Sequence, residues 1–216
     1  MKTRFGIATV IALAAASNAV AAEVYVGTGL PRLIVGVAQP LSDTVLLRAD
    51  AASIGSITDT YSENGIIYRG RLRHDRIGLF ADWFVAGGFR LTSGLTVNDT
   101  RLNLNAQGNG GSLTIGSTTY VTTPDDRWSV DVRFPRATPY LGLGYGRQPG
   151  GTAAIGFAAD LGVSIGRAKV SARVSGPNLP GAVTQEDIDR ELAELRNDVA
   201  RVRVIPQLSA AISFRF

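Results

Sequence analysis

The last twelve residues follow a two-residue period, and this feature constrains the fold more than any other in the chain. Ile205 to Phe216 reads I-P-Q-L-S-A-A-I-S-F-R-F. An alternation of this kind predicts a β-strand with one apolar face and one polar face. A strand with lipid on one side and a polar barrel interior on the other needs this pattern. The apolar parity consists of Leu208, Ala210, Ile212, Phe214 and Phe216, and the polar parity of Gln207, Ser209, Ala211, Ser213 and Arg215.

The amino terminus has the three parts of a secretory signal peptide. Lys2 and Arg4 precede an apolar run, residues 5–16, and the small-x-small sequence A-V-A at 19–21 follows. The run is shorter than the roughly 20 residues that a spanning helix needs, which disfavours a membrane anchor. We therefore expect residues 1–21 to be removed and residues 22–216 to form the mature domain.

The charge and length of the mature chain exclude some partners and architectures. Loss of Lys2 and Arg4 lowers the formal net charge from +4 to +2, and the remaining basic residues are scattered. This distribution predicts no nucleic-acid partner. No later segment is apolar for long enough to cross a bilayer as a helix, so a mature chain in a membrane has to be a closed barrel. A chain of this length forms one domain.

Alternating segments predict eight strands and allow two topologies. In the preferred one, residues 23–30 and 32–38 are separate strands and 153–175 is a single long strand. In the other, 23–38 is one strand and 169–175 stands alone. The first places the short turns at 39–43, 86–88 and 148–151 together on the periplasmic side, as outer-membrane barrels do. The remaining predicted strands are 44–53, 66–85, 89–98, 132–145 and 205–216. The polar segment 56–65 is expected to be a loop or the splayed end of a hairpin, and 100–131 a long mobile extension.

The period changes from two to between three and four residues near the end of the chain. Thr184 is a suitable helix cap, and Glu186 and Asp187 suit a first turn. The segment 184–202 is therefore predicted to be an amphipathic helix in an extramembrane loop, packed against protein. Its apolar stripe consists of Ile188, Leu192, Leu195, Val199 and Val202.

These patterns together predict an all-β fold: an eight-stranded antiparallel transmembrane β-barrel with one amphipathic helix before the last strand. A barrel of eight strands has an interior that side chains fill. Charges buried there need partners, so we expect a network of Arg–Asp pairs that closes the lumen. The alternative is that the same side chains line a narrow polar pathway. The expected inward charges are Arg48, Asp50, Asp82, Arg90, Asp160 and Arg215.

The sequence offers little for catalysis or metal binding. His74 is the only histidine, lies beside Asp75 in a charged segment, and is expected to be solvated. The sequence G-V-S-I-G at 162–166 matches Gly-x-Ser-x-Gly, but it lies within an alternating strand segment and not at the strand-to-helix turn of a nucleophile elbow. There is no cysteine, and no glycine-rich loop opens a helix. We therefore predict no catalytic, cofactor-binding or metal-binding residues.

Three segments resemble those of small Gram-negative outer-membrane proteins of the OmpA, OmpX and OmpW barrel type. They are G-L-F-A-D-W-F at 78–84, G-F-R-L-T-S-G-L at 88–95 and P-Y-L-G-L-G-Y-G at 139–146. The terminal Phe214 and Phe216 also resemble the carboxyl-terminal signal that the outer-membrane insertion machinery reads in such barrels. The resemblance implies export through the periplasm to the outer membrane, with membrane lipid, lipopolysaccharide and the insertion machinery as partners. It also implies a monomer.

Four functional hypotheses follow. The main one is a non-enzymatic outer-membrane protein with an envelope-structural or surface-interaction role. The second is a narrow channel for small solutes that uses the inward charges. The third is a lipid-modifying barrel enzyme that uses His74. The fourth is a soluble periplasmic barrel of lipocalin type, in which the apolar parity faces inward.

Overall fold

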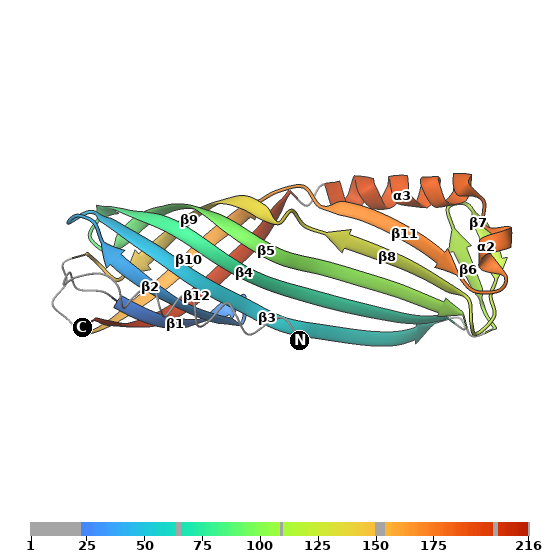
Figure 1. Ribbon diagram of the computed structural model, residues 1–216, viewed down its shortest axis with the longest axis horizontal. Coiled ribbons are helices and arrows are strands. Elements are labelled where there is room, and N and C mark those ends of the chain that lie inside the picture. Colours follow the sequence, from blue (N-terminus) through green and yellow to red (C-terminus); the bar gives the residue numbers. More distant parts are fainter. Residues whose placement is uncertain (1–22, 64–65, 109, 150–153, 201–202, 216) are drawn as a thin grey trace.

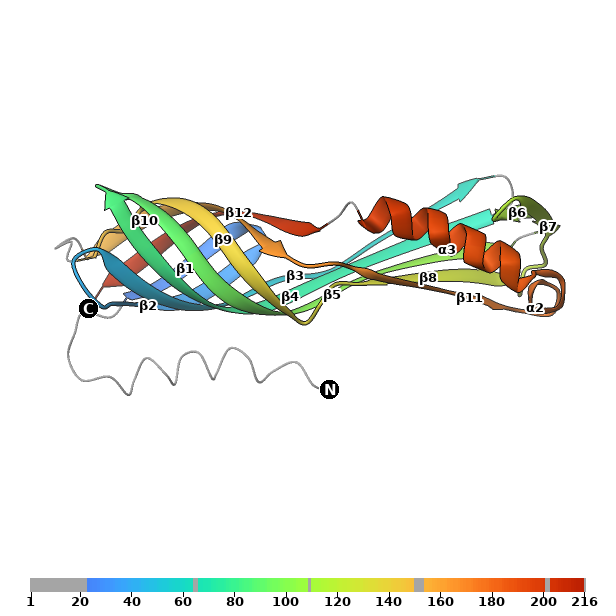
Figure 2. The ribbon, with the colours of Figure 1, turned by 90° about the horizontal axis from the view of Figure 1, so that it is seen from above.

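The computed structural model describes residues 23–63, 66–108, 110–149, 154–200 and 203–215, and within them it contains twelve strands and two helices. The molecule is elongated, with a ring of strands at one end and a sheet extension at the other (Figures 1 and 2). Within the described residues, neither helix is long and apolar enough to cross a membrane. The elements are β1 Glu23–Leu30, β2 Leu33–Pro40, β3 Val45–Glu63, β4 Ile66–Ala86, β5 Phe89–Gly108, β6 Ser112–Ile115, β7 Thr118–Val121, β8 Arg127–Arg133, β9 Ala137–Gly146, β10 Ile155–Ile165, β11 Lys169–Ser175, α2 Leu179–Ala182, α3 Gln185–Ala200 and β12 Val204–Arg215.

Eight antiparallel strands close on one another to form the ring. Their order is β1-β2-β3-β4-β5-β9-β10-β12, and β12 pairs again with β1. The prediction of eight antiparallel strands in a ring is confirmed, as is the division of residues 23–40 into two strands. Glu23 pairs with both Ala38 and Arg215, so the turn after β2 lies at the same end of the ring as the last strand's carboxyl end. Closure leaves no strand of the ring with an unpaired edge.

Apolar side chains point away from the ring and polar ones point into it. Leu79, Leu95 and Phe157 are 63%, 69% and 69% exposed on the outside. Asp82 and Arg90, on the opposite parity of β4 and β5, are completely buried. The ring segments of β9, β10 and β12 are 10, 11 and 12 residues long, which matches the roughly 9–11 residues of a membrane-spanning strand.

The extension is built where β3, β4 and β5 continue beyond the ring. There β5 pairs with β8, and β8 pairs with β11. Helix α3 lies along this sheet, and the β6–β7 hairpin lies near its far end (Figures 1 and 2). Between sheet and helix is an apolar core. Its buried members are Ile66, Ala106, Leu113, Ile115, Trp128, Val130, Val170, Leu179, Val183 and Leu192.

This core corrects two predictions. Residues 100–131 were expected to be a mobile polar extension, yet most of them lie in β5, β6, β7 and β8. Trp128 and Val130 give them an apolar face to bury. Residues 56–65 were expected to be a loop or the splayed end of a hairpin, but β3 runs to Glu63 and its residues from Ser56 onward pair with β4.

Two predicted strands are each broken into two where ring and extension separate. The segment 132–145 divides into β8 and β9, and 153–175 divides into β10 and β11. In each case one part stays in the ring while the other joins the extension. These two divisions turn the eight predicted strands into ten, and the β6–β7 hairpin brings the number to twelve. A second, four-residue helix, α2, precedes α3.

Helix α3 begins where the sequence indicates. The Thr184 hydroxyl accepts a hydrogen bond from the Asp187 amide at 3.2 Å, which is a standard amino-terminal cap. Leu192 is buried, with Ile188 and Leu195 half-buried beside it. The predicted helix end at Val202 and the signal peptide, residues 1–21, lie outside the described residues.

Candidate functional site: the charged interior of the ring

Four side chains near one another in the ring form a closed cycle of alternating charge. Arg48 Nε lies 2.6 Å from Asp82 Oδ2, and Arg48 Nη2 lies 3.3 Å from Asp160 Oδ1. Arg90 completes the cycle, with Nη2 at 2.7 Å from Asp160 and Nε at 3.4 Å from Asp82. The four residues come from β3, β4, β5 and β10 and are at most 8% exposed. The cycle therefore ties four strands together across the lumen.

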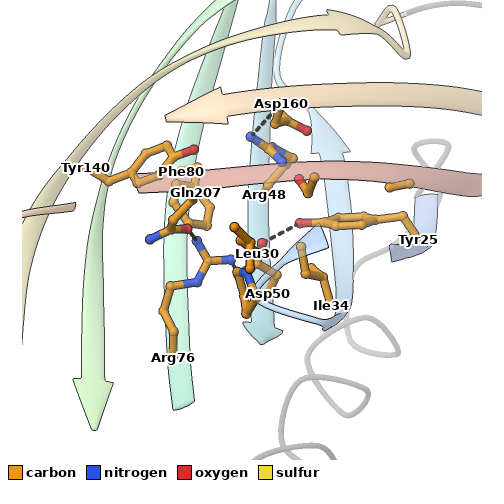
Figure 3. Close-up of a pocket in the computed structure, with 13 residues that line it drawn as sticks. Tyr25, Leu30, Ile34, Arg48, Asp50, Arg76, Phe80, Tyr140, Asp160 and Gln207 are labelled. Atoms are coloured by element: carbon orange, nitrogen blue, oxygen red, sulfur yellow. Dashed lines mark hydrogen bonds and ion pairs between the residues drawn. The ribbon is translucent and has the colours of Figure 1, made fainter. Parts of the chain in front are cut away.

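A second group lies beside this cycle and is centred on Asp50. One carboxylate oxygen pairs with Arg76 at 2.7 Å, and the other accepts a hydrogen bond from the Tyr25 hydroxyl at 3.1 Å. Arg76 also donates to the side-chain oxygen of Gln207, whose amide donates to Ser164 at 2.8 Å. Figure 3 shows Tyr25, Asp50, Arg76 and Gln207 pointing toward one another. The group links β1, β3, β4, β10 and β12.

The third group lies at the end of the ring where β12 ends. Glu23 is buried and pairs with Arg215. Arg147 Nε is 3.8 Å from the other Glu23 oxygen, and the Arg147 guanidinium lies over the Tyr25 ring, 4.2 Å from its centroid. Arg147 follows β9 with a φ of 42°, in the left-handed region that non-glycine residues seldom adopt. Its side chain is 5% exposed and forms no hydrogen bond within the described residues.

Aromatic rings fill the space between the charged groups. The guanidinium carbons of Arg48 and Arg76 lie 5.2 Å and 5.1 Å from the centroid of the Phe80 ring, within the range of cation–π attraction. Tyr140 meets Phe80 edge-on, with centroids 4.9 Å apart. Gly78 leaves room for Phe80, since a Cβ at this position would be 2.2 Å from the Phe80 ring. The inward glycine and the inward aromatic therefore form one packing unit.

This arrangement leaves very little open volume in the middle of the ring. The cavity between Tyr25, Arg48, Arg76, Phe80 and Tyr140 has a volume of about 20 Å³, which is room for about one water molecule. A larger hollow of about 240 Å³ lies at the end of the ring beside Glu23, Arg147 and Arg215. The ring is hollow at this end and filled in the middle.

The expectation of a solvated His74 is wrong. The residue is 6% exposed, and its Nδ1 lies 2.6 Å from the Thr100 hydroxyl oxygen. It is inward-facing because its parity is that of Arg76 and Phe80. The neighbouring Asp75 faces the other way and bonds Ser53 and Arg73. No carboxylate in the described residues therefore orients the imidazole.

The predicted inward charges divide between the three groups. Arg48, Asp82, Arg90 and Asp160 form the cycle, Asp50 belongs to the second group, and Arg215 lies in the third. The prediction omitted Arg76, Glu23 and Arg147. Arg76 has the same parity as Asp82, and Glu23 the same parity as the buried Tyr25, so parity alone could have identified both. Phe214 is 49% exposed on the outside of β12, and Phe216 lies outside the described residues.

Comparison with known proteins gives structural neighbours only. No protein-family model and no curated protein sequence matches this chain. Acinetobacter baumannii CarO2 aligns with a TM-score of 0.62 at 15% identity, over 93% of this chain and 100% of that one. Acinetobacter baumannii CarO aligns with a TM-score of 0.54 at 16% identity, over 91% and 97%. A major outer membrane protein from Thermus thermophilus aligns with a TM-score of 0.42 at 13% identity, over 91% and 98%.

These neighbours are outer-membrane β-barrel proteins. The two CarO alignments cover almost the whole of both chains and show that this chain shares their fold. At these identities the similarity carries no information on ligand or solute.

Proposed function

We propose that this protein is a closed, non-enzymatic outer-membrane barrel that holds a rigid extension at the cell surface for surface interaction. The observation that carries the proposal is the filled ring. The Arg48–Asp82–Arg90–Asp160 cycle spans the lumen, and the cavity beside it holds about 20 Å³. A lumen filled in this way favours an anchor over a pathway.

The extension supports the surface role because it has a core of its own. Trp128, Val130 and Leu192 are buried between the sheet and α3. A structured platform of this kind presents fixed side chains, as a rigid binding surface requires. We propose that the extension lies outside the cell and that the turns after β2 and β4 face the periplasm, in keeping with short periplasmic turns and long external segments in such barrels.

The assembly partners are part of the proposal. The outward Phe214 and the terminal Phe216 would be read by the outer-membrane insertion machinery after export through the periplasm. The chain would then work as a monomer in contact with membrane lipid and lipopolysaccharide. The paired edges of the ring are consistent with a monomer, because no strand of the ring needs a second copy to complete it.

Conductance tests the closed ring against the channel hypothesis. The refolded mature protein is inserted into planar bilayers, and single-channel current is recorded. We expect insertion without steady conductance. Steady current that changes when Asp82 is replaced by Asn, and does not change for Arg101→Gln in the extension, would instead support a pathway through the inward charges.

Cysteine labelling tests the orientation. The sequence has no cysteine, so a single introduced one is labelled without background. Thr60→Cys lies in the extension and Asp43→Cys in the turn after β2, and both positions are exposed. A membrane-impermeant maleimide on intact cells should label the Thr60→Cys protein and reach the Asp43→Cys protein only after the cells are opened. The reverse result would contradict surface display of the extension.

A further inference from the structure

A row of four cations crosses the outer face of the sheet at the junction between ring and extension. In strand register, Arg73 of β4 pairs with Arg101 of β5, Arg101 pairs with Arg133 of β8, and Arg133 pairs with Lys169 of β11. Directly paired side chains in a sheet lie on the same face, about 4.5–5.5 Å apart at Cβ. The four residues therefore form a continuous basic row, and all are substantially exposed.

The row lies immediately beyond the apolar outer band of the ring. Arg73 and Arg101 have the same outward parity as Ile77 and Val97, which pair with each other and are 46% and 61% exposed. Four residues separate the two positions on each strand, about 13 Å along the strand before any tilt is considered. If the apolar band contacts the hydrocarbon of the bilayer, the basic row lies at the level of the headgroups on the extension side.

The intramolecular partners do not account for this alignment of like charges. Arg73 pairs with Asp75 at 2.7 Å, and Arg101 pairs with Asp99 at 2.8 Å. Arg133 and Lys169 form no ion pair within the described residues. Asp99 also lies 3.8 Å from Arg73 and so bridges the first two cations of the row. Like charges directly opposite one another destabilise a sheet, and no acid among the described residues pairs with Arg133 or Lys169 to offset their repulsion. The other acid close to it, Asp131, accepts a hydrogen bond from Asn103.

Two further cations lie in the segments where the chain passes from ring to extension. Arg136 lies between β8 and β9, and Arg167 lies between β10 and β11. Both are exposed, and neither forms an ion pair within the described residues.

We propose that this row binds the phosphate groups of phosphorylated lipid headgroups in the leaflet on the extension side. Arginine presents a planar fork of donors that matches phosphate oxygens, and lysine adds a point charge. Long basic side chains at a bilayer edge can keep their stems along apolar surface and their charges at the headgroups. The inference rests on the membrane position proposed above and adds the residues and the chemical group that they recognise.

Native mass spectrometry of the refolded mature protein in a non-ionic detergent tests the proposal. The probes are bisphosphorylated lipid A and the same lipid with both phosphates removed. Wild-type protein should retain the phosphorylated lipid and release the dephosphorylated one. The double variant Arg133→Gln, Lys169→Gln should bind the phosphorylated lipid roughly thirtyfold more weakly, at about 1 kcal/mol per basic residue near an anionic surface.

The matched control removes the same charge from the same face, farther from the ring. Arg69 and Arg173 lie on the outward parity four residues beyond the row, at positions that align through β5 and β8. The double variant Arg69→Gln, Arg173→Gln should bind within about twofold of wild type, since the attraction falls off within a Debye length. Equal loss in the two double variants, or equal retention of the two lipids, would overturn the proposal.

The design separates this inference from the proposed function. Lipid retention in detergent does not depend on orientation in cells, and the labelling experiment does not depend on lipid affinity. If the double variant at Arg133 and Lys169 does not fold, Lys169→Gln alone replaces it, with Arg173→Gln as its control. The expected loss is then about fivefold, and an equal effect of the two single variants would contradict phosphate binding by the row.

Discussion

The ring and the extension are built from the same strands, yet the chemistry of their two faces is inverted. On the ring part of β4, Asp82 points inward and Trp83 outward, where it is 56% exposed. On the extension part of the same strand, the inward position is taken by Ile66, which is buried, and the outward one by the exposed Arg69. Even-numbered residues of β4 face inward in both parts. They are mainly polar or aromatic in the ring and apolar at Ile66 in the extension, where the outward residues are charged.

The inversion shows that the surroundings of each face, rather than the strand itself, determine the pattern. Around the ring, lipid would contact the outside, so apolar side chains belong there and the polar ones must pair inside. Around the extension, water contacts the outside, and part of the inside is covered by α3. Ring stability therefore depends on satisfied charges, while extension stability depends on apolar burial.

The largest effect that separates the two parts is expected from removal of one acid of the cycle. Asp82→Ala leaves Arg48 and Arg90 with Asp160 alone, and removing one partner of a buried pair costs about 3–5 kcal/mol. We expect a loss of that size in the free energy of unfolding, measured by urea titration of the protein in vesicles.

Asp99→Ala is the matched control, because Asp99 pairs with Arg101 on the outer face of the same sheet and is 40% exposed. Exposed pairs contribute about 0–1 kcal/mol. If the two variants lose equal free energy of unfolding, the buried charges do not stabilise the ring more than exposed pairs stabilise the outer face. That result would contradict the contrast drawn between ring and extension.

The next largest effect tests the outer faces. Leu91 and Asn105 lie on β5 with the same outward parity, one in the ring and the other in the extension. Arginine on a lipid-contacting face costs about 2–4 kcal/mol near the bilayer midplane. Leu91→Arg should therefore destabilise the protein in vesicles by about that amount, and Asn105→Arg by less than about 0.5 kcal/mol. Equal effects would indicate that the outside of the ring does not contact lipid.

The ring strands could be predicted from the sequence because their alternation is uninterrupted. Residues 155–165 and 205–215 keep one parity apolar from end to end, and both form strands of the ring. The extension was missed for the opposite reason. Along β4 the apolar residues lie at odd positions in the ring and at even positions, such as Ile66 and Leu72, in the extension. Arg69, Arg71 and Arg73 therefore suggested a segment without a buried face.

A second obstacle lies in β3. The pairing with β4 shifts between Ser53 and Gly55, so the residues that face inward change from even to odd numbers. Ile57 and Tyr61 therefore lie on the same face of β3 as Arg48. A prediction that assumes one alternation along the whole strand assigns them to the opposite face. Gly55 lies at this shift with a φ of 69°, and an isolated glycine inside a strand pattern is the sequence signal that could have suggested a bulge there.

The charged groups show where parity helps and where it does not. Arg48, Asp82, Arg90 and Asp160 were found because they alternate with apolar residues in ring strands. Arg147 could not be found in this way, since it lies in the turn after β9 and reaches the lumen only through its left-handed backbone conformation. Which acid pairs with which arginine also depends on strand stagger, which the sequence does not reveal.

The smallest effect is expected at the far end of the extension, where one carboxylate joins the β7–β8 turn to helix α2. Asp126 is fully buried. One of its oxygens accepts hydrogen bonds from the amides of Asn178 and Leu179, both at 3.0 Å. The other accepts bonds from the amide and the hydroxyl of Thr123, at 2.9 and 2.8 Å. Burial alone would raise the pKa of Asp126, but these four donors outweigh it and lower the pKa to about 2.

A pKa below that of the unfolded chain, about 3.9 for Asp, means that the folded extension favours the ionised carboxylate. The stabilisation is complete above about pH 4 and is lost as the pH falls toward 2. Asp126→Asn should reduce stability by about 2 kcal/mol at neutral pH, one pKa unit being worth about 1.4 kcal/mol. It should also flatten the pH dependence between about 4 and 2. Hydrogen exchange of the β8 and β11 amides, followed across this range, measures the local effect.

Asp125→Asn serves as the control, since Asp125 is adjacent and exposed, and it should leave both quantities unchanged. Amides of the ring, such as those of β10, should keep their protection in both variants, because Asp126 stabilises the extension alone. If Asp126→Asn weakens protection in the ring as much as in the extension, the two parts unfold as one cooperative unit despite their opposite chemistry. Loss confined to β8 and β11 would instead establish the extension as a separately stable body anchored on the ring.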